Sequence, residues 1–299
     1  MKRNIIIFII LALLVVAGCD TEEAPTETAK VFLGGTDGVT ASFEAFGVAE
    51  DGTYTLFDED TFPIDVTLKN KGEYDVKAEE VKVNLLGPSQ DEFDGIKAWE
   101  LKNTNLIDMK SDLIPEGGEE TVDFASEAKY KSKVIAFTDR VWFANIEYVY
   151  QTKLIIPEAC LKEDLADERV CDVKGDKTFH VSGAPVTVTN VEESVAGKGI
   201  MALKITVEKR GNGKVTQPDN KFSATKEEFA YTIDDAAWKC TSAGQESKAR
   251  LIEGKADIVC KSREALKEGT LATKQVSLTL DYKYQDLVQE TLRIKESAK

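Results

Sequence analysis

Five cysteines are the side chains whose types and spacing point most directly to chemistry in this 299-residue chain. A cysteine sulfur can carry a covalent modification, form a disulfide or bind zinc. Cys19 stands alone near the N-terminus, whereas the other four cysteines lie in the second half of the sequence, at Cys160, Cys171, Cys240 and Cys260. The two groups predict different chemistry, and both depend on the compartment in which the chain folds.

Cys19 ends a segment that has the pattern of an export signal. A Lys-Arg pair comes first, residues 5–16 are all apolar, and Ala17 and Gly18 stand directly before the cysteine. A basic start, an apolar centre and small residues before a cut are typical of a secretory signal. The apolar run is shorter than the roughly 20 residues of a membrane-spanning helix, so we expect a cleaved signal.

Because a cysteine follows the small pair, Val16-Ala17-Gly18-Cys19 resembles the lipobox of bacterial-type lipoproteins. The resemblance implies that residues 1–18 are a signal peptide and that Cys19 carries diacylglycerol through a thioether. The protein would then be held by lipid at the extracytoplasmic face of the cell membrane. Residues 19–29 contain no large apolar side chain after the cysteine and are expected to be a flexible tether. The alternative is an ordinary secretory signal with a chance cysteine.

The four remaining cysteines form an even set, which predicts two disulfides in an exported chain. Three pairings are possible. We favour Cys160–Cys171 and Cys240–Cys260, because the members of each pair are close in sequence and bracket a loop or hairpin. A four-cysteine zinc site is the alternative, but no two of these cysteines have C-x-x-C spacing.

Residues for catalysis or metal binding are sparse. His180 is the single histidine, which excludes multi-histidine metal sites and argues against a histidine-centred triad. Acidic clusters such as Asp58-Glu59-Asp60 and residues 91–94 could offer oxygens to calcium, but neither has the spacing of an EF-hand loop. With 53 acidic residues, such clusters arise by chance on solvated faces. We therefore predict no catalytic residues, no metal site and no cofactor.

Apolar and polar residues alternate with period two in many short stretches. Examples are residues 62–68, 81–85, 201–207 and 276–282. This alternation is typical of half-buried antiparallel strands, and glycine- and asparagine-containing breaks separate the stretches. The best helical candidate is short and covers residues 161–170.

The predicted fold class is all-β, with two tandem immunoglobulin-like antiparallel β-sandwich domains after the N-terminal signal and lipid anchor. The first sandwich covers residues 30–156 and ends on a long strand that Pro157 terminates. Residues 157–172 form a disulfide-closed connector, and residues 173–296 form the second sandwich. That sandwich closes on a pair of strands near residues 273–284 and 287–294.

The stretch from Phe62 to Leu86 resembles the CARDB-like, immunoglobulin-fold domains of archaeal and bacterial surface proteins. The resemblance rests on Val66-Thr-Leu-Lys-Asn-Lys-Gly72 and Ala78-Glu-Glu-Val-Lys-Val-Asn84. It implies that the Asn-x-Gly element closes a hairpin between two core strands. It bears on the fold more than on the function.

Net charge narrows the set of partners. The formal charge is −15, and it becomes −17 when cleavage of the signal removes Lys2 and Arg3. Such a surface disfavours nucleic acid and anionic membranes. We expect a noncatalytic, membrane-anchored envelope lipoprotein that acts as a structural, adhesion or protein-binding module, with a cell-surface protein as its partner. The alternative is a lipoprotein that binds a solute, a sugar or an ion, or a carboxylate-dependent hydrolase, with its site at the interdomain interface near residues 157–172.

Overall fold

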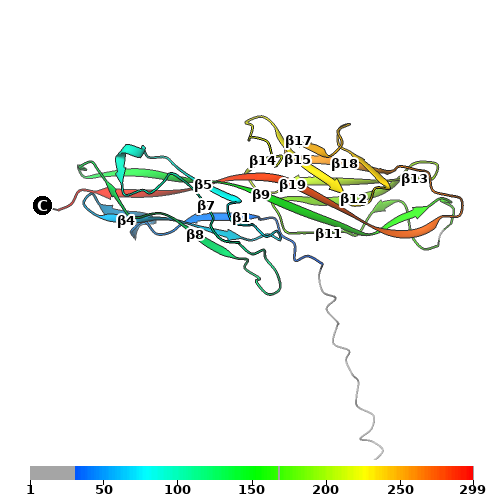
Figure 1. The fold of residues 1–299 in the computed structure, drawn as a ribbon, viewed down its shortest axis with the longest axis horizontal. Coiled ribbons are helices and arrows are strands. Elements are labelled where there is room, and N and C mark those ends of the chain that lie inside the picture. Colours follow the sequence, from blue (N-terminus) through cyan, green and yellow to red (C-terminus); the bar gives the residue numbers. More distant parts are fainter. Residues whose placement is uncertain (1–30, 168, 299) are drawn as a thin grey trace, which may run out of the picture. The chain divides into compact units, whose positions relative to one another are not determined.

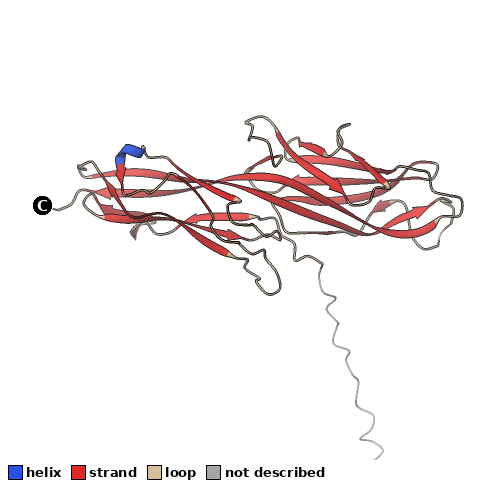
Figure 2. Cartoon of the chain, in the orientation of Figure 1, coloured by secondary structure: helices blue, strands red, loops and turns tan. Residues whose placement is uncertain are grey.

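The chain folds almost entirely into β-strands. The computed structural model describes residues 31–167 and 169–298. Its one short helical element within these residues is a 3-10 turn, η1 (Gln90–Glu92), and Figure 2 shows how fully strands dominate the rest. The all-β antiparallel fold predicted from the period-two pattern is therefore confirmed, and the predicted helix at 161–170 is wrong. Leu161 and Lys162 instead pair with the strand opposite them.

Two smaller sheets account for nine of the strands. The four-stranded sheet has the order β1 (Val39–Phe43), β4 (Thr61–Asn70), β8 (Glu119–Tyr130) and β6 (Phe93–Asp94). The five-stranded sheet has the order β10 (Gly175–Asp176), β12 (Val186–Gly197), β13 (Ile200–Lys209), β18 (Lys255–Ser262) and β16 (Trp238–Thr241).

A ten-stranded sheet faces both of them. Its main path is β17 (Lys248–Leu251), β15 (Glu227–Ile233), β19 (Leu271–Lys295), β9 (Phe137–Lys162), β5 (Val81–Leu86) and β7 (Glu100–Lys102). Four further strands join its sides: β11 (His180–Val181) on β9, β14 (Lys214–Thr216) and β3 (Thr53–Phe57) on β19, and β2 (Val48–Glu50) on β3. The β3–β19 pair is parallel, whereas the other described strand pairs are antiparallel.

The strands β9 and β19 are paired along their whole length. They lie side by side in Figure 1, β9 in green and β19 in red, and their register joins Leu271 to Lys162 at one end and Lys295 to Phe137 at the other. At about 3.3 Å per residue, each strand is roughly 80 Å long. The predicted break between two strands at residues 285–286 is absent, because β19 is continuous.

Pro157 does not terminate β9, contrary to the prediction. The strand continues to Lys162, and the register shifts between Lys274 and Val276 on β19. Pro157 has no N–H to donate to a ladder, so a proline is tolerated in a strand where a bulge leaves it unpaired. The segment 157–172 is consequently strand up to residue 162 and loop beyond it.

The four-stranded sheet packs on one half of β9 and the five-stranded sheet on the other half. Trp142 of β9 is fully buried against the rings of Phe62 and Phe93, which belong to the four-stranded sheet. Farther along β9, the Thr152 hydroxyl donates to the Val186 carbonyl of the five-stranded sheet at 2.5 Å. The inward residues of the predicted alternating stretches are buried, as expected: Phe62, Ile64, Val66, Leu68, Val81, Val83, Leu85, Met201, Leu203, Ile205, Val207, Val276, Leu278, Leu280 and Tyr282.

The predicted hairpin at Asn70-Lys71-Gly72 is wrong. The strand before it, β4, pairs with β1 and β8, whereas the strand after it, β5, pairs with β9 and β7. The Asn-x-Gly element thus carries the chain from one sheet to the sheet facing it. The boundaries at residues 156 and 173 remain a prediction about independent folding units. The structure shows that β9 crosses the first boundary and that β19 also pairs with β3.

Candidate functional site

The four cysteines of the second half form two disulfides. Cys240 and Cys260 are opposite each other on the neighbouring strands β16 and β18, with Cα atoms 3.9 Å apart. Cys160, on β9, is bonded to Cys171 and closes the loop that follows the strand. These are the pairings favoured by sequence proximity. Cys19 and the predicted signal lie outside the described residues.

Beside the first disulfide, Glu193 of β12 is fully buried and touches two partners. Its carboxylate accepts a hydrogen bond from the Cys160 N–H at 2.9 Å and lies 2.7 Å from the Lys177 Nζ. Burial raises the pKa of the Glu193 carboxyl above its ordinary value, while the Lys177 ammonium opposes the shift. The hydrogen bond from Cys160 ties the five-stranded sheet to the end of β9, and the ion pair with Lys177 compensates the charge of the buried carboxylate.

In the two acidic clusters that could offer oxygens to calcium, Asp58 and Glu92 accept hydrogen bonds from other parts of the chain. Asp58 accepts hydrogen bonds from the Val134 N–H and from the backbone and hydroxyl of Ser297, and these bonds lower its pKa. Glu92 accepts from the Arg140 guanidinium at 2.7 Å. Within residues 31–167 and 169–298, no group of three or more His, Cys, Asp or Glu side chains is arranged to hold a metal ion. His180 is half-buried on β11, opposite Ile155.

Two hollows flank the loop between β18 and β19. One, of about 630 Å³, is bordered by the loop after β9 and by residues 268–271, and its described lining contains charged residues but no aromatic ring. The other, of about 550 Å³, has Trp238 and Leu266 on its wall. Solute-binding sites are typically lined by apolar and aromatic side chains with a few convergent polar groups. The first hollow, at residues 157–172, lacks that lining.

A row of four tyrosines occupies the middle of the paired strands, where both smaller sheets meet the ten-stranded sheet. Tyr150 is opposite Tyr282, and Tyr148 is opposite Tyr284. The Tyr150 hydroxyl donates to Asn70 Oδ1 of β4 at 2.9 Å, and the Tyr282 hydroxyl accepts from the Val186 N–H of β12 at 3.4 Å. Burial raises the pKa of all four, that of Tyr284 to about 12. The tyrosine row therefore joins the ten-stranded sheet to both smaller sheets.

The outward side of the ten-stranded sheet, where it covers the four-stranded sheet, carries six exposed apolar residues. We call it the apolar face, and it consists of Val48, Phe57, Leu86, Phe137, Val141 and Leu287. The strand registers place them on one side of the sheet: Phe57 and Phe137 both pair with Lys295, and Leu86 pairs with Phe143, a half-buried ring on the same side. Val48 is 70% exposed and Phe137 is 55% exposed.

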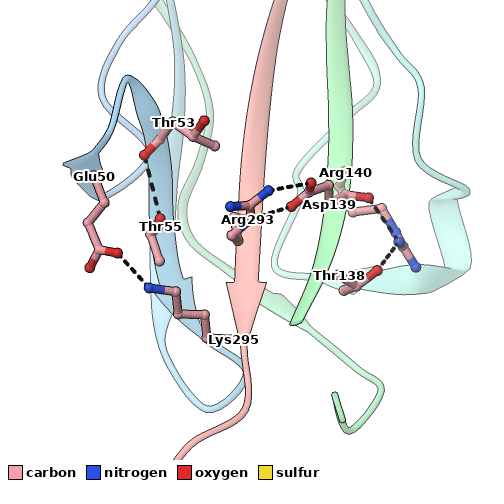
Figure 3. A network of polar contacts seen from close by, with 8 residues as sticks. All are labelled: Glu50, Thr53, Thr55, Thr138, Asp139, Arg140, Arg293 and Lys295. Carbon is pink, nitrogen blue, oxygen red and sulfur yellow. Dashed lines mark hydrogen bonds and ion pairs between the residues drawn. The ribbon is translucent and has the colours of Figure 1, made fainter. Parts of the chain in front are cut away.

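The charged side chains on the apolar face are paired with one another. In Figure 3, Arg293 of β19 reaches the Asp139 carboxylate on β9 with two hydrogen bonds of 2.8 Å, and Lys295 contacts Glu50 of β2. The Arg293 guanidinium also lies 4.6 Å from the centre of the Phe137 ring. These hydrogen bonds from Arg293 lower the pKa of Asp139. The charges therefore compensate each other and leave the apolar side chains as the free surface.

The facing sheet provides a comparison within the same molecule. Apart from Pro63, the outward residues of β4 and β8 are mostly polar, and there the Thr67 and Thr121 hydroxyls lie 2.9 Å apart. One side of an antiparallel sheet that faces water normally has this polar character. The apolar face was not predicted from the sequence. A signal for it exists in Val141-Trp-Phe-Ala144, where consecutive apolar residues place apolar side chains on both sides of β9.

No protein-family model and no curated protein matches this sequence. Among the described residues, no helix has the length and apolar composition needed to cross a bilayer. The candidate site therefore rests on geometry, and the apolar face is the feature with the clearest capacity to bind.

Proposed function

We propose that this chain is a noncatalytic, membrane-anchored envelope lipoprotein that binds a protein partner through the apolar face. The lipid is attached at Cys19, and the strands lie on the extracytoplasmic side. The apolar face is the observation that carries the proposal. Contiguous exposed apolar patches on a soluble surface mark interaction sites, whereas scattered apolar residues do not.

The composition of the apolar face supports a protein partner rather than a small solute. Phenylalanine and arginine are enriched in protein interfaces, and a few aromatic anchors usually carry most of the affinity. Phe57 and Phe137 provide two such anchors, with Arg293 lying over the second. A flat sheet surface also suits another protein better than a solute, because small ligands need a concave site.

Site-specific photocrosslinking in the native cells tests the partner. A photoreactive phenylalanine analogue at Val141 lies on the apolar face, and the same analogue at Lys129 of β8 lies exposed on the facing sheet. We expect a discrete crosslinked product from position 141 and none from position 129. Equal products, or none at either position, would reject the apolar face as the binding surface.

The intact mass of the mature, nonreduced protein tests the anchor separately. A chain that starts at Cys19 with added lipid mass and no free thiol supports the proposal. In addition, Cys19→Ala should release much of the protein from membranes. A chain that starts at Met1, or a Cys19→Ala variant that stays fully membrane-bound, would mean that lipid at Cys19 is not the anchor.

A further inference from the structure

A second group of exposed apolar residues lies on one long loop, residues 103–118, which connects β7 to β8. Leu106, Met109, Leu113 and Ile114 are all exposed there, and Leu113 is 93% exposed. These residues belong to none of the five strands, β2, β3, β5, β9 and β19, that form the apolar face. We call residues 111–114 the loop tip.

The loop backbone is held in place by hydrogen bonds. Ile107 is fully buried and exchanges two backbone hydrogen bonds with Val76, of 2.8 and 3.2 Å. The buried Asn103 side chain accepts from the Val81 N–H at 2.8 Å. At the loop tip, Ser111 and Ile114 exchange two backbone bonds of 3.1 Å. A fixed backbone thus presents Leu113 to the surroundings without covering it.

The loop lies beside the point where the described chain begins. The Glu73 carboxylate accepts hydrogen bonds from the Leu33 and Gly34 N–H groups, both at 2.8 Å. The adjacent Gly72 carbonyl accepts from the Lys110 N–H of the loop, also at 2.8 Å. Gly72 and Glu73 therefore form hydrogen bonds both with Lys110, next to the loop tip, and with residues 33–34 at the start of the folded chain.

We infer that the loop tip inserts its apolar side chains into the lipid bilayer to which Cys19 is attached. This inference rests on the proposed lipid anchor. The chain from Cys19 to Leu33 can extend at most about 50 Å, which keeps the region around residues 72–73 within reach of the bilayer. Once the lipid at Cys19 is in the bilayer, a short linker raises the effective concentration of the loop tip at the bilayer to the order of millimolar. Even a weak affinity of the loop tip for lipid then gives substantial insertion.

The chemistry favours a lipid interior over charged headgroups. Lys69, Lys71 and Lys110 are balanced by Asp108, Asp112 and Glu116, and the Lys69 ammonium lies 3.4 Å from the Glu116 carboxylate. A basic cluster, which anionic lipids require, is absent from this loop. Insertion should therefore occur in zwitterionic vesicles and should be insensitive to salt.

The test uses the full lipidated protein in phosphatidylcholine vesicles. A polarity-sensitive fluorophore is attached at Leu113→Cys, since the four other mature cysteines outside the lipid site are in disulfides. The matched control is Ile135→Cys, a residue that is 88% exposed between β8 and β9. Lipids with a quencher on the acyl chain should quench the probe at 113 several-fold more than the probe at 135, at low and high salt alike.

Vesicle flotation is measured on the same samples, which separates the two proposals. Protein that does not float has no lipid anchor, and the proposed function then fails with the inference. Protein that floats but shows equal quenching at both positions overturns the inference alone. Emission at position 113 that shifts to the blue in detergent as protein concentration rises would assign the loop tip to a second copy of the chain and would also overturn it.

Discussion

At the scale of single residues, hydrogen bonds from backbone N–H groups to a carboxylate connect segments that are far apart in the sequence. Glu73 accepts three N–H groups, from Leu33, Gly34 and Gly183, and the third bond measures 2.6 Å. A charged acceptor makes each such bond stronger than a neutral one. One side chain thus joins the start of the folded chain to the segment before β12.

Glu73→Ala should lower the free energy of unfolding by about 1–3 kcal/mol, because three backbone donors lose a charged acceptor. Denaturant unfolding monitored by circular dichroism measures the change. Glu73→Gln, which keeps one acceptor oxygen, should lose less than Glu73→Ala. An alanine variant as stable as the wild type would show that water replaces the carboxylate at no cost.

Glu193→Ala should cost more, about 3–5 kcal/mol, since it leaves Lys177 without its buried partner. The control is Glu116→Ala, which removes a carboxylate that is 83% exposed and paired with Lys69. Exposed ion pairs contribute about 0–1 kcal/mol. If both variants unfold at the same denaturant concentration, the Glu193 ion pair does not stabilise the fold.

At the scale of the element, β19 has different neighbours within the ten-stranded sheet along its length. Its first half pairs with β15 and its last residues pair with β3, while β9 accompanies it throughout. Leu292 and Ile294 from the end of the chain are fully buried. The core beneath the apolar face therefore depends on β19.

Leu292→Ala should destabilise the protein by about 2–5 kcal/mol through lost burial and a residual cavity. Leu287→Ala, on the same strand, removes a leucine that is exposed on the apolar face. Substitutions at exposed surface positions usually change stability by less than about 0.5 kcal/mol. Thermal and denaturant unfolding of the pair measure this difference, and similar losses in both variants would contradict the burial of Leu292.

At the scale of the whole molecule, the tyrosine row makes the stability of the fold depend on pH. The folded-state pKa of each of the four tyrosines is raised above the ordinary value near 10 by burial, to about 12 for Tyr284. A raised folded-state pKa means that the stabilisation is complete below pH ~10 and is lost as the pH rises through the folded-state pKa. The fold should therefore weaken in alkali.

Alkaline titration followed by tyrosinate absorbance should couple ionisation of the tyrosine row to unfolding. All eight tyrosines of the chain are buried or half-buried. The row should ionise only above pH ~10, together with loss of the β-sheet signal in circular dichroism. Tyr284→Phe should reduce the absorbance change that accompanies this loss. Complete ionisation of all tyrosines with an intact β-sheet signal would refute the burial of the row.

Local patterns in the sequence determined a large part of the fold. Period-two alternation in stretches such as 62–68 identified which side chains are buried, because a strand places successive side chains on opposite sides. Proximity in sequence favoured Cys160–Cys171 and Cys240–Cys260, since short loops bring such pairs together. The strand ends were less predictable. Because Pro157 has no N–H to donate, it predicts the end of a strand. In the fold, the irregularity in the pairing of β9 with β19 leaves Pro157 unpaired, so the strand continues past it.

The all-β class, the buried side of the alternating stretches and the favoured cysteine pairs follow from the sequence itself, because they depend on residue type and short spacing. The tertiary structure alone decided which strands are neighbours. Pairing β19 with both β3 and β9 joins residues more than 100 positions apart. The apolar face also needs β5 beside β9, where Leu86 is opposite Phe143. Alternation shows that a strand has a buried side, but the pattern is the same whichever strand lies next to it.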